Sequence, residues 1–274
     1  MNYRLLALDL DGTALSSEKI VTDRTAAAIR RAIAAGKEVL FATGRAPSEL
    51  REHLQRFPEM NYLLCLSGAT VRDLRAGKDL NIVNIPLHIV EKIMEISKKV
   101  DAMVAIYAGE DVFVEKTYQG NMGWYGCACF EPLYDSCAIW VDSLDEAISL
   151  RGNDVRKINF YFHSTEDWRA AGEVLGKLPV AHASGIPNNY EISPQGVDKG
   201  VGLTSLCETL GIPISQAIAV GDEGNDVAMI QAAGLGVAMG NATEEVKAVA
   251  DAVTEYGVDE DGFGRYFEDH WFNR

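Results

Sequence analysis

No stretch of this sequence is apolar for long enough to cross a membrane. A membrane-spanning helix needs roughly 20 consecutive apolar residues, and no uninterrupted run of about 18 occurs anywhere in the chain. The first apolar run, residues 5–8, is too short for the core of a signal peptide. These absences predict a cytoplasmic protein with no membrane partner.

Positive charge is scarce as well. The chain has 25 Lys and Arg residues against 40 Asp and Glu residues, which gives a formal net charge of −15 at pH 7. Affinity for nucleic acid and for anionic membranes comes largely from Lys and Arg, so neither is expected as a partner. An anionic small molecule would have to be held by local groups, because salt screens remote surface charges.

Cysteine is present in a number that argues against a disulfide framework. Five cysteines in 274 residues leave one unpaired and are too sparse to stabilise a chain of this size. The cysteines at 127, 129 and 137 match no usual zinc-binding spacing. Repeats and low-complexity tracts are also missing, and the length favours two domains or one large unit with an insertion.

Two aspartates directly follow the first apolar run. Residues 5–8 are predicted to form a buried parallel strand, and Asp9 and Asp11 come where it ends. Because successive strand residues point to opposite faces, both carboxylates would share a face while Leu10 points away. Gly12 permits a sharp turn whose N–H groups can face an anion. Two crowded acids favour a cation between them, and hard oxygen ligands suit Mg²⁺.

A second predicted strand, residues 38–42, is followed by Thr43 and Gly44. Carboxyl ends of parallel strands meet at one edge of a sheet, where ligands bind. The Thr43 hydroxyl and the Gly44 N–H would therefore stand beside the Asp9 loop, and both can donate hydrogen bonds to a phosphate oxygen.

Two further segments supply a cation and more acids. Lys199 opens a predicted helix, and its compact ammonium can neutralise both Asp9 and a phosphoryl group. A third apolar strand, residues 217–220, delivers Asp222 to the same edge. Asp226 lies four residues later, about one helical turn, so both carboxylates could face a metal if a helix starts there.

Each segment alone has an ordinary explanation. The Asp9 segment could be a turn or part of a calcium loop, although such a loop would place Ile20 at its closing twelfth position instead of Glu. A single lysine at a helix start is usually solvated, and Arg45 fits a structural role, so it is left out of the catalytic set. The joint pattern is harder to explain by coincidence, since all segments stand at element ends in one consistent order.

Together these segments resemble the haloacid dehalogenase-like (HAD) superfamily of phosphotransferases, and specifically its Cof-type phosphatases. The resemblance covers roughly residues 1–82 and 186–274. It implies that Asp9 is the nucleophile and that Asp11 is the general acid and base.

The same resemblance implies a set of ligands. Mg²⁺ would be held by the Asp9 carboxylate, the Asp11 backbone carbonyl and Asp222, with Asp226 supporting them. The groups implied to bind the substrate phosphate are Leu10, Thr43, Gly44, Lys199 and Asn225.

The middle of the chain has a different pattern. A helical stretch, strand-like runs and further helices follow one another as α+β and not as repeating βαβ units. This insertion resembles the C2 type of cap. We therefore expect an α/β fold: a Rossmann-like, doubly wound parallel sheet core formed by residues 1–82 and 187–274, with an inserted α+β cap domain at 83–186.

The expected activity is hydrolysis of small phosphorylated metabolites, with sugar phosphates as the leading class, by a Mg²⁺-dependent phosphatase that forms an aspartyl phosphate. Two alternatives stay open. A phosphomutase would use the same nucleophile but return the phosphoryl group to the substrate. A receiver-like signalling protein also combines aspartates, Thr and Lys around Mg²⁺, but it is about half this length. The oligomeric state is not predicted.

Overall fold

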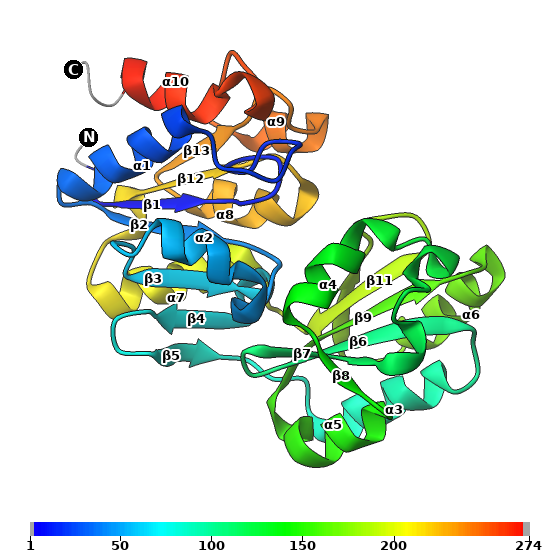
Figure 1. The fold of residues 1–274 in the computed structure, drawn as a ribbon. Helices are drawn as coiled ribbons and strands as arrows, with labels where there is room; N and C mark the ends of the chain where they lie inside the picture. Colours follow the sequence, from blue (N-terminus) through cyan, green and yellow to red (C-terminus); the bar gives the residue numbers. More distant parts are fainter. Residues whose placement is uncertain (1–2, 271–274) are drawn as a thin grey trace. The chain divides into compact units, whose positions relative to one another are not determined.

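The computed structural model describes residues 3–270, and the chain divides into two compact units (Figure 1). The first unit comprises the residues up to Gly44, Glu52–Asn81 and the residues from Asp198 onward. The second unit comprises Arg45–Arg51 and Ile82–Val197. The expected α/β class with an inserted α+β unit is confirmed.

The first unit is built on an eight-stranded sheet with strand order β14-β13-β12-β1-β2-β3-β4-β5. The strands from β14 to β3 are all parallel, and β4 pairs with β3 in the antiparallel sense. The strands are β1 (Leu5–Leu8), β2 (Glu38–Ala42), β3 (Tyr62–Cys65), β4 (Thr70–Asp73), β5 (Lys78–Ile82), β12 (Ala217–Gly221), β13 (Leu235–Ala238) and β14 (Ala252–Val253).

Helices cover both faces of this sheet, with α2 in front of β3 and α7 behind it in the view of Figure 1. They are α1 (Asp23–Ala34), α2 (Arg51–Arg56), α7 (Lys199–Leu210), α8 (Val227–Ala232), α9 (Glu244–Val249) and α10 (Gly262–His270). The central strand β1 is fully buried because it is apolar at every position and flanked by parallel neighbours. Thr22 caps α1, accepting a hydrogen bond from the Thr25 N–H at 3.2 Å.

The second unit contains a six-stranded sheet with order β10-β11-β9-β6-β7-β8, antiparallel except between β7 and β8. Its strands are β6 (Ala102–Ala108), β7 (Asp111–Glu115), β8 (Ile139–Val141), β9 (Val155–Phe162), β10 (Val180–Ala183) and β11 (Asn189–Pro194). Its helices are α3 (Leu87–Ser97), α4 (Glu131–Cys137), α5 (Leu144–Arg151) and α6 (Thr165–Leu175).

The two faces of this second sheet differ in polarity. On β9, Ile158, Phe160 and Phe162 point into an apolar core shared with α3, α5 and α6. Asn159 and Tyr161 alternate with them and therefore point to the opposite face. The opposite face thus carries buried polar groups.

The observed division differs from the expected domain bounds in two places. We placed residues 187–197 in the first unit, but they contain β11, which pairs with β9 inside the second sheet. The short segment Arg45–Arg51 also belongs to the second unit, where the Ser48 N–H donates to the Glu110 carbonyl at 3.2 Å. The division therefore falls immediately after Gly44. Among residues 3–270, no helix is both long and apolar enough to cross a membrane.

Candidate active site

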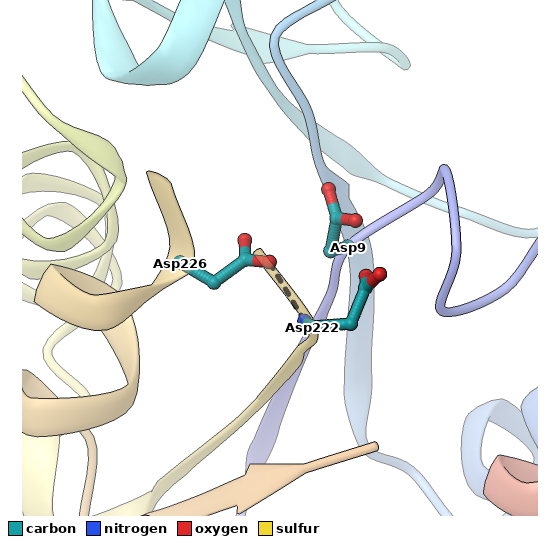
Figure 2. Close-up of side chains that lie close together, drawn as sticks. All are labelled: Asp9, Asp222 and Asp226. Carbon is teal, nitrogen blue, oxygen red and sulfur yellow. Dashed lines mark hydrogen bonds between the residues drawn. The ribbon is translucent and has the colours of Figure 1, made fainter. Parts of the chain in front are cut away.

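Three buried aspartates meet at the carboxyl edge of the first sheet. Asp9 follows β1, and its N–H donates to the Val220 carbonyl at 2.9 Å, which extends the pairing of β1 with β12 by one residue. Asp222 follows β12, and Asp226 ends a short 3₁₀ turn, Gly224–Asp226. Carboxylate oxygens of these three residues, which we call the acidic cluster, lie within 4.8 Å of one another (Figure 2).

Lys199 joins two members of the acidic cluster. It is the first residue of α7 and is completely buried. Its Nζ donates to Asp9 Oδ1 and to Asp226 Oδ1, each at 2.6 Å. Although burial favours the neutral amine, Asp226 and Asp9 raise the pKa of Lys199 above its usual value. The lysine is therefore charged in this site.

Asp226 serves the cluster through hydrogen bonds. Its Oδ1 accepts from Lys199. Its Oδ2 accepts from the backbone N–H of Asp222 at 2.9 Å (Figure 2) and from that of Glu223 at 3.1 Å. Asp226 thereby fixes the backbone of Asp222 and the position of Lys199. The expectation that Asp222 and Asp226 face one metal stays a prediction, with a 3₁₀ turn and not an α-helical turn between them.

Asp222 is held from the opposite side by the turn that follows Asp11. Thr13 Oγ1 donates to Asp222 Oδ1 at 2.6 Å, and Asn241 Nδ2 lies 3.4 Å from Asp222 Oδ2. Gly12 has φ +81°, and a Cβ there would stand 2.2 Å from Asp222 Oδ2. Only glycine both adopts this conformation readily and allows the turn to approach so closely.

Asp11 lies outside the acidic cluster. Its carboxylate Oδ1 accepts from Lys19 Nζ at 2.9 Å in a pair that is exposed on both sides. Its backbone forms an isolated bridge with Leu15. The side chain is thus separate from the other three acids, which agrees with a role different from theirs.

The remaining predicted residues occupy one edge but differ in exposure. Thr43 follows β2, is buried, and hydrogen-bonds through its N–H to the Leu64 carbonyl at 2.8 Å; Gly44 comes next. Leu10 has a fully buried side chain, so only its backbone can serve a ligand. Asn225 is exposed within the 3₁₀ turn before Asp226.

The charges of the acidic cluster do not balance. Three carboxylates against the Lys199 ammonium leave a net charge of −2 when all are ionised. Burial and the Asp226 charge raise the pKa of Asp9 well above the usual range, and burial raises the pKa of Asp222 to about 6. A divalent cation would compensate this charge, and hard carboxylate oxygens suit Mg²⁺. Asp9, Asp222 and Asp226 each bring a carboxylate oxygen within 4.8 Å of the others, so these three residues could hold such a cation.

Two contributors to this site had no role assigned from the sequence. Thr13 stands inside the first motif, but only the structure shows its hydroxyl on Asp222. Asn241 also donates to the Gly12 carbonyl at 2.9 Å. The signal for Asn241 is its place just beyond the apolar strand β13, where the strand-end argument used for Thr43 applies equally.

Comparison with known proteins agrees with this geometry. A family model described as haloacid dehalogenase-like hydrolase matches residues 6–267. The chain belongs to this family. The hydrolase is 28% identical over 275 residues to the 5-amino-6-(5-phospho-D-ribitylamino)uracil phosphatase YcsE of Bacillus subtilis, covering 99% of this chain and 96% of that protein. It is 29% identical over 263 residues to the pyridoxal phosphate phosphatase YbhA of Escherichia coli, covering 92% and 93%.

A solved structure extends the similarity to three dimensions. BT1666 of Bacteroides thetaiotaomicron, described as one of the phosphatases of the HAD superfamily, is 31% identical with a TM-score of 0.80, covering 97% of this hydrolase and 94% of that chain. The predicted family and the predicted enzyme class, a phosphoric monoester hydrolase, are confirmed by these relatives.

Proposed function

We propose that this hydrolase is a Mg²⁺-dependent phosphatase that acts on small phosphorylated metabolites through an aspartyl phosphate on Asp9. The observation that carries the proposal is the Lys199 ammonium, fully buried and 2.6 Å from both Asp9 and Asp226. A buried carboxylate held beside a lysine is suited to attack an anionic phosphoryl group, because the lysine offsets the repulsion between them.

The chemistry divides into two displacements. In the first, the Asp9 oxygen without the Lys199 hydrogen bond attacks phosphorus, the bond to the leaving oxygen breaks, and protonated Asp11 gives its proton to that oxygen. In the second, Asp11 takes a proton from water, the water oxygen bonds to phosphorus, and the Asp9–phosphorus bond breaks. The site returns to its starting protonation after both steps.

Other groups would hold the phosphoryl oxygens. Donors at the edge are the Leu10 and Gly44 N–H groups, the Thr43 hydroxyl, Lys199 and Asn225. Mg²⁺, when bound by Asp9, the Asp11 carbonyl and Asp222, supplies positive charge to the same oxygens. Asp226 would keep Asp222 in place.

Small phosphomonoesters, with sugar phosphates leading, are the proposed substrate class. Two relatives are named for such compounds, a phosphoribitylamino uracil and pyridoxal phosphate. We propose that the second unit is the cap that recognises the leaving group, since it is inserted between Gly44 and Lys199 and its segment Arg45–Arg51 directly follows Gly44. The cytoplasm is the proposed compartment, which agrees with five cysteines that are all free.

A steady-state assay of phosphate release across sugar phosphates, nucleotides and phosphorylated cofactors tests the proposal. We expect turnover that chelation abolishes and Mg²⁺ restores. Asp9→Asn should lower kcat by several orders of magnitude with the fold intact, because the isosteric amide does not attack phosphorus. A variant that retained about a tenth of the wild-type rate would exclude the covalent mechanism. Single phosphorylation without net phosphate release would favour a phosphomutase or a receiver-like protein.

A further inference from the structure

Lys19 holds an unusual position in the turn beyond the acidic cluster. The turn is closed by hydrogen bonds from the Lys19 N–H to the Ser16 carbonyl and from the Ser16 N–H to the Ile20 carbonyl, each 2.9 Å long. Lys19 has φ +61°, in the left-handed region. Glycine or asparagine adopts this conformation at lower cost than lysine does. The backbone therefore does not explain why lysine stands here.

The stability gained from the ion pair with Asp11 does not explain why lysine stands at position 19 either. The Lys19 side chain is 63% exposed and that of Asp11 38%, and their atoms lie 2.9 Å apart. Ion pairs this open to water contribute little to folding, because both partners are well solvated without each other. A strained residue whose main contact adds little stability points to a functional constraint on that contact.

The partner of Lys19 is the residue that must meet the leaving-group oxygen. Asp11 sits at the open side of the site, and its carboxylate is not packed among the buried acids. Lys19 reaches Oδ1 from a turn that is itself anchored, because the Ser17 N–H donates to Asp259 Oδ1 at 2.8 Å.

We propose that Lys19 is a positioning residue for the general acid. Its ammonium holds Oδ1 of the Asp11 carboxyl group, so that Oδ2, which carries the proton in the first step, is oriented toward the leaving oxygen. Lys19 thus acts on leaving-group departure through Asp11 and not on phosphate binding. The inference rests on the proposed function, in which Asp11 protonates the leaving group. The phosphate itself is held by other groups, so removal of Lys19 leaves that binding in place.

The test compares Lys19→Gly and Lys19→Asn, which both suit the left-handed backbone, with Lys19→Arg, which keeps the charge. The kcat of Lys19→Gly should fall about tenfold with an alkyl phosphate and less than about twofold with 4-nitrophenyl phosphate, whose leaving oxygen needs little protonation. Lys19→Asn should behave in the same way, and Lys19→Arg should restore most of the alkyl phosphate rate. Inhibition by inorganic phosphate should not change.

Two controls separate positioning from a structural effect. Glu18→Gln removes a charge from the same exposed turn and should leave both rates unchanged. Lys19→Gly relieves backbone strain, so its Tm should equal or exceed that of the wild type. A loss that is equal for both substrates, or a weaker inhibition by phosphate, overturns the proposal.

A double variant distinguishes the positioning role of Lys19 from the general-acid role of Asp11 on which it rests. If Lys19 acts through Asp11, Lys19→Gly should cause no further loss of kcat in an Asp11→Asn background. Additive losses overturn the role of Lys19 alone. If Asp11→Asn itself slows alkyl and aryl phosphates equally, the general-acid role of Asp11 is wrong and the inference falls with it.

Discussion

Each unit buries one lysine, and the two lysines have different surroundings. Lys199 in the first unit is completely buried between Asp9 and Asp226, within an excess of negative charge. Lys157 in the second unit is 4% exposed, pairs with Glu191 at 2.6 Å, and lies 5.4 Å from the centre of the Tyr107 ring. Lys199 lies among three carboxylates, whereas Lys157 pairs with Glu191 and also interacts electrostatically with the buried Glu49.

The polar groups near Lys157 are mostly neutral. Tyr134 stands between the hydroxyls of Tyr107 and Tyr161, each 2.9 Å away, and Asn159 Nδ2 donates to both of the outer hydroxyls. We call these four residues the tyrosine cluster. Burial raises the pKa of the three tyrosines well above the usual value, so the hydroxyls stay neutral.

The contrast shows that the charge balance of a buried polar cluster indicates whether the cluster binds a ligand or stabilises the fold. The tyrosine cluster satisfies most of its hydrogen bonds internally, as buried groups must to be stable. The acidic cluster, when its three carboxylates are ionised, carries an uncompensated charge of −2 at the sheet edge where ligands bind. Unbalanced buried charge indicates a site that is completed by a cation and a substrate, whereas a balanced polar cluster indicates structure.

Replacing each buried lysine in turn should give the largest difference in kcat between the two units. Lys199→Met should lower kcat about a thousandfold or more, because it removes charge stabilisation beside the reacting phosphoryl group. Lys157→Met should keep kcat for 4-nitrophenyl phosphate within about threefold and lower stability by about 1 to 3 kcal/mol. Phosphate release and urea unfolding measure the two effects. Similar kinetic losses in both variants would break the comparison.

Inserting one methyl group in each unit should give the next largest difference. A Cβ at Gly12 would lie 2.2 Å from Asp222 Oδ2, and one at Gly172 would lie 2.2 Å from the Tyr190 hydroxyl. Gly12→Ala should lower kcat/KM about a hundredfold, since small displacements of catalytic groups are costly. Gly172→Ala creates an equal overlap in the second unit and should lower Tm while leaving turnover of an aryl phosphate nearly unchanged. A purely structural loss in Gly12→Ala would contradict this.

Sequence was most informative where a strand and its function coincide. The strand β1 was predicted with the bounds that the structure has, because a short apolar run followed by acids is typical of a buried parallel strand that ends at a ligand edge. Thr43 and Asp222 were placed by the same argument and lie at that edge. At these positions one local signal, an apolar run followed by polar residues, predicts both the strand and the place of the site residue in the fold.

Other features depended on partners far away in sequence. The boundary near residue 186 was misplaced because β11 reads as an ordinary strand, and only its pairing with β9 assigns it to the second sheet. The direction of the Asp226 carboxylate follows from Lys199, 27 residues earlier, and from two backbone N–H groups. Lys19 was overlooked because neither its left-handed backbone nor its contact with Asp11 has a local signature.

The pH dependence of stability should distinguish the two clusters more finely. The pKa of Asp222 is about 6 in the folded protein, against about 3.9 in an unfolded chain. The folded state thus binds the proton more tightly, so this contribution to stability is complete below pH about 4 and is lost as pH rises to about 6. Without Mg²⁺, the ionisation of Asp222 should therefore lower Tm as the pH rises from about 4 to about 6.

Added Mg²⁺ should reverse the trend, because it requires ionised carboxylates. The rise in Tm caused by Mg²⁺ should be larger near pH 7.5 than near pH 5, to an extent of a few degrees. Asp222→Asn should remove most of this rise, while Glu191→Gln in the second unit should leave it intact. An equal Mg²⁺ effect at both pH values would argue against cation binding at the acidic cluster.

The smallest expected effect comes from the centre of the tyrosine cluster. Tyr134→Phe removes one hydroxyl that bonds Tyr107 and Tyr161, but both outer hydroxyls keep the hydrogen bond from Asn159. Each lost internal hydrogen bond costs about 1 kcal/mol, so Tm should fall by roughly 2 to 8 °C. The kcat for 4-nitrophenyl phosphate should not change, because no member of the cluster is charged or reactive. A Tyr134→Phe variant with wild-type Tm and altered kcat would show that balanced buried polarity also serves the reaction, and the distinction drawn between the two units would then fail.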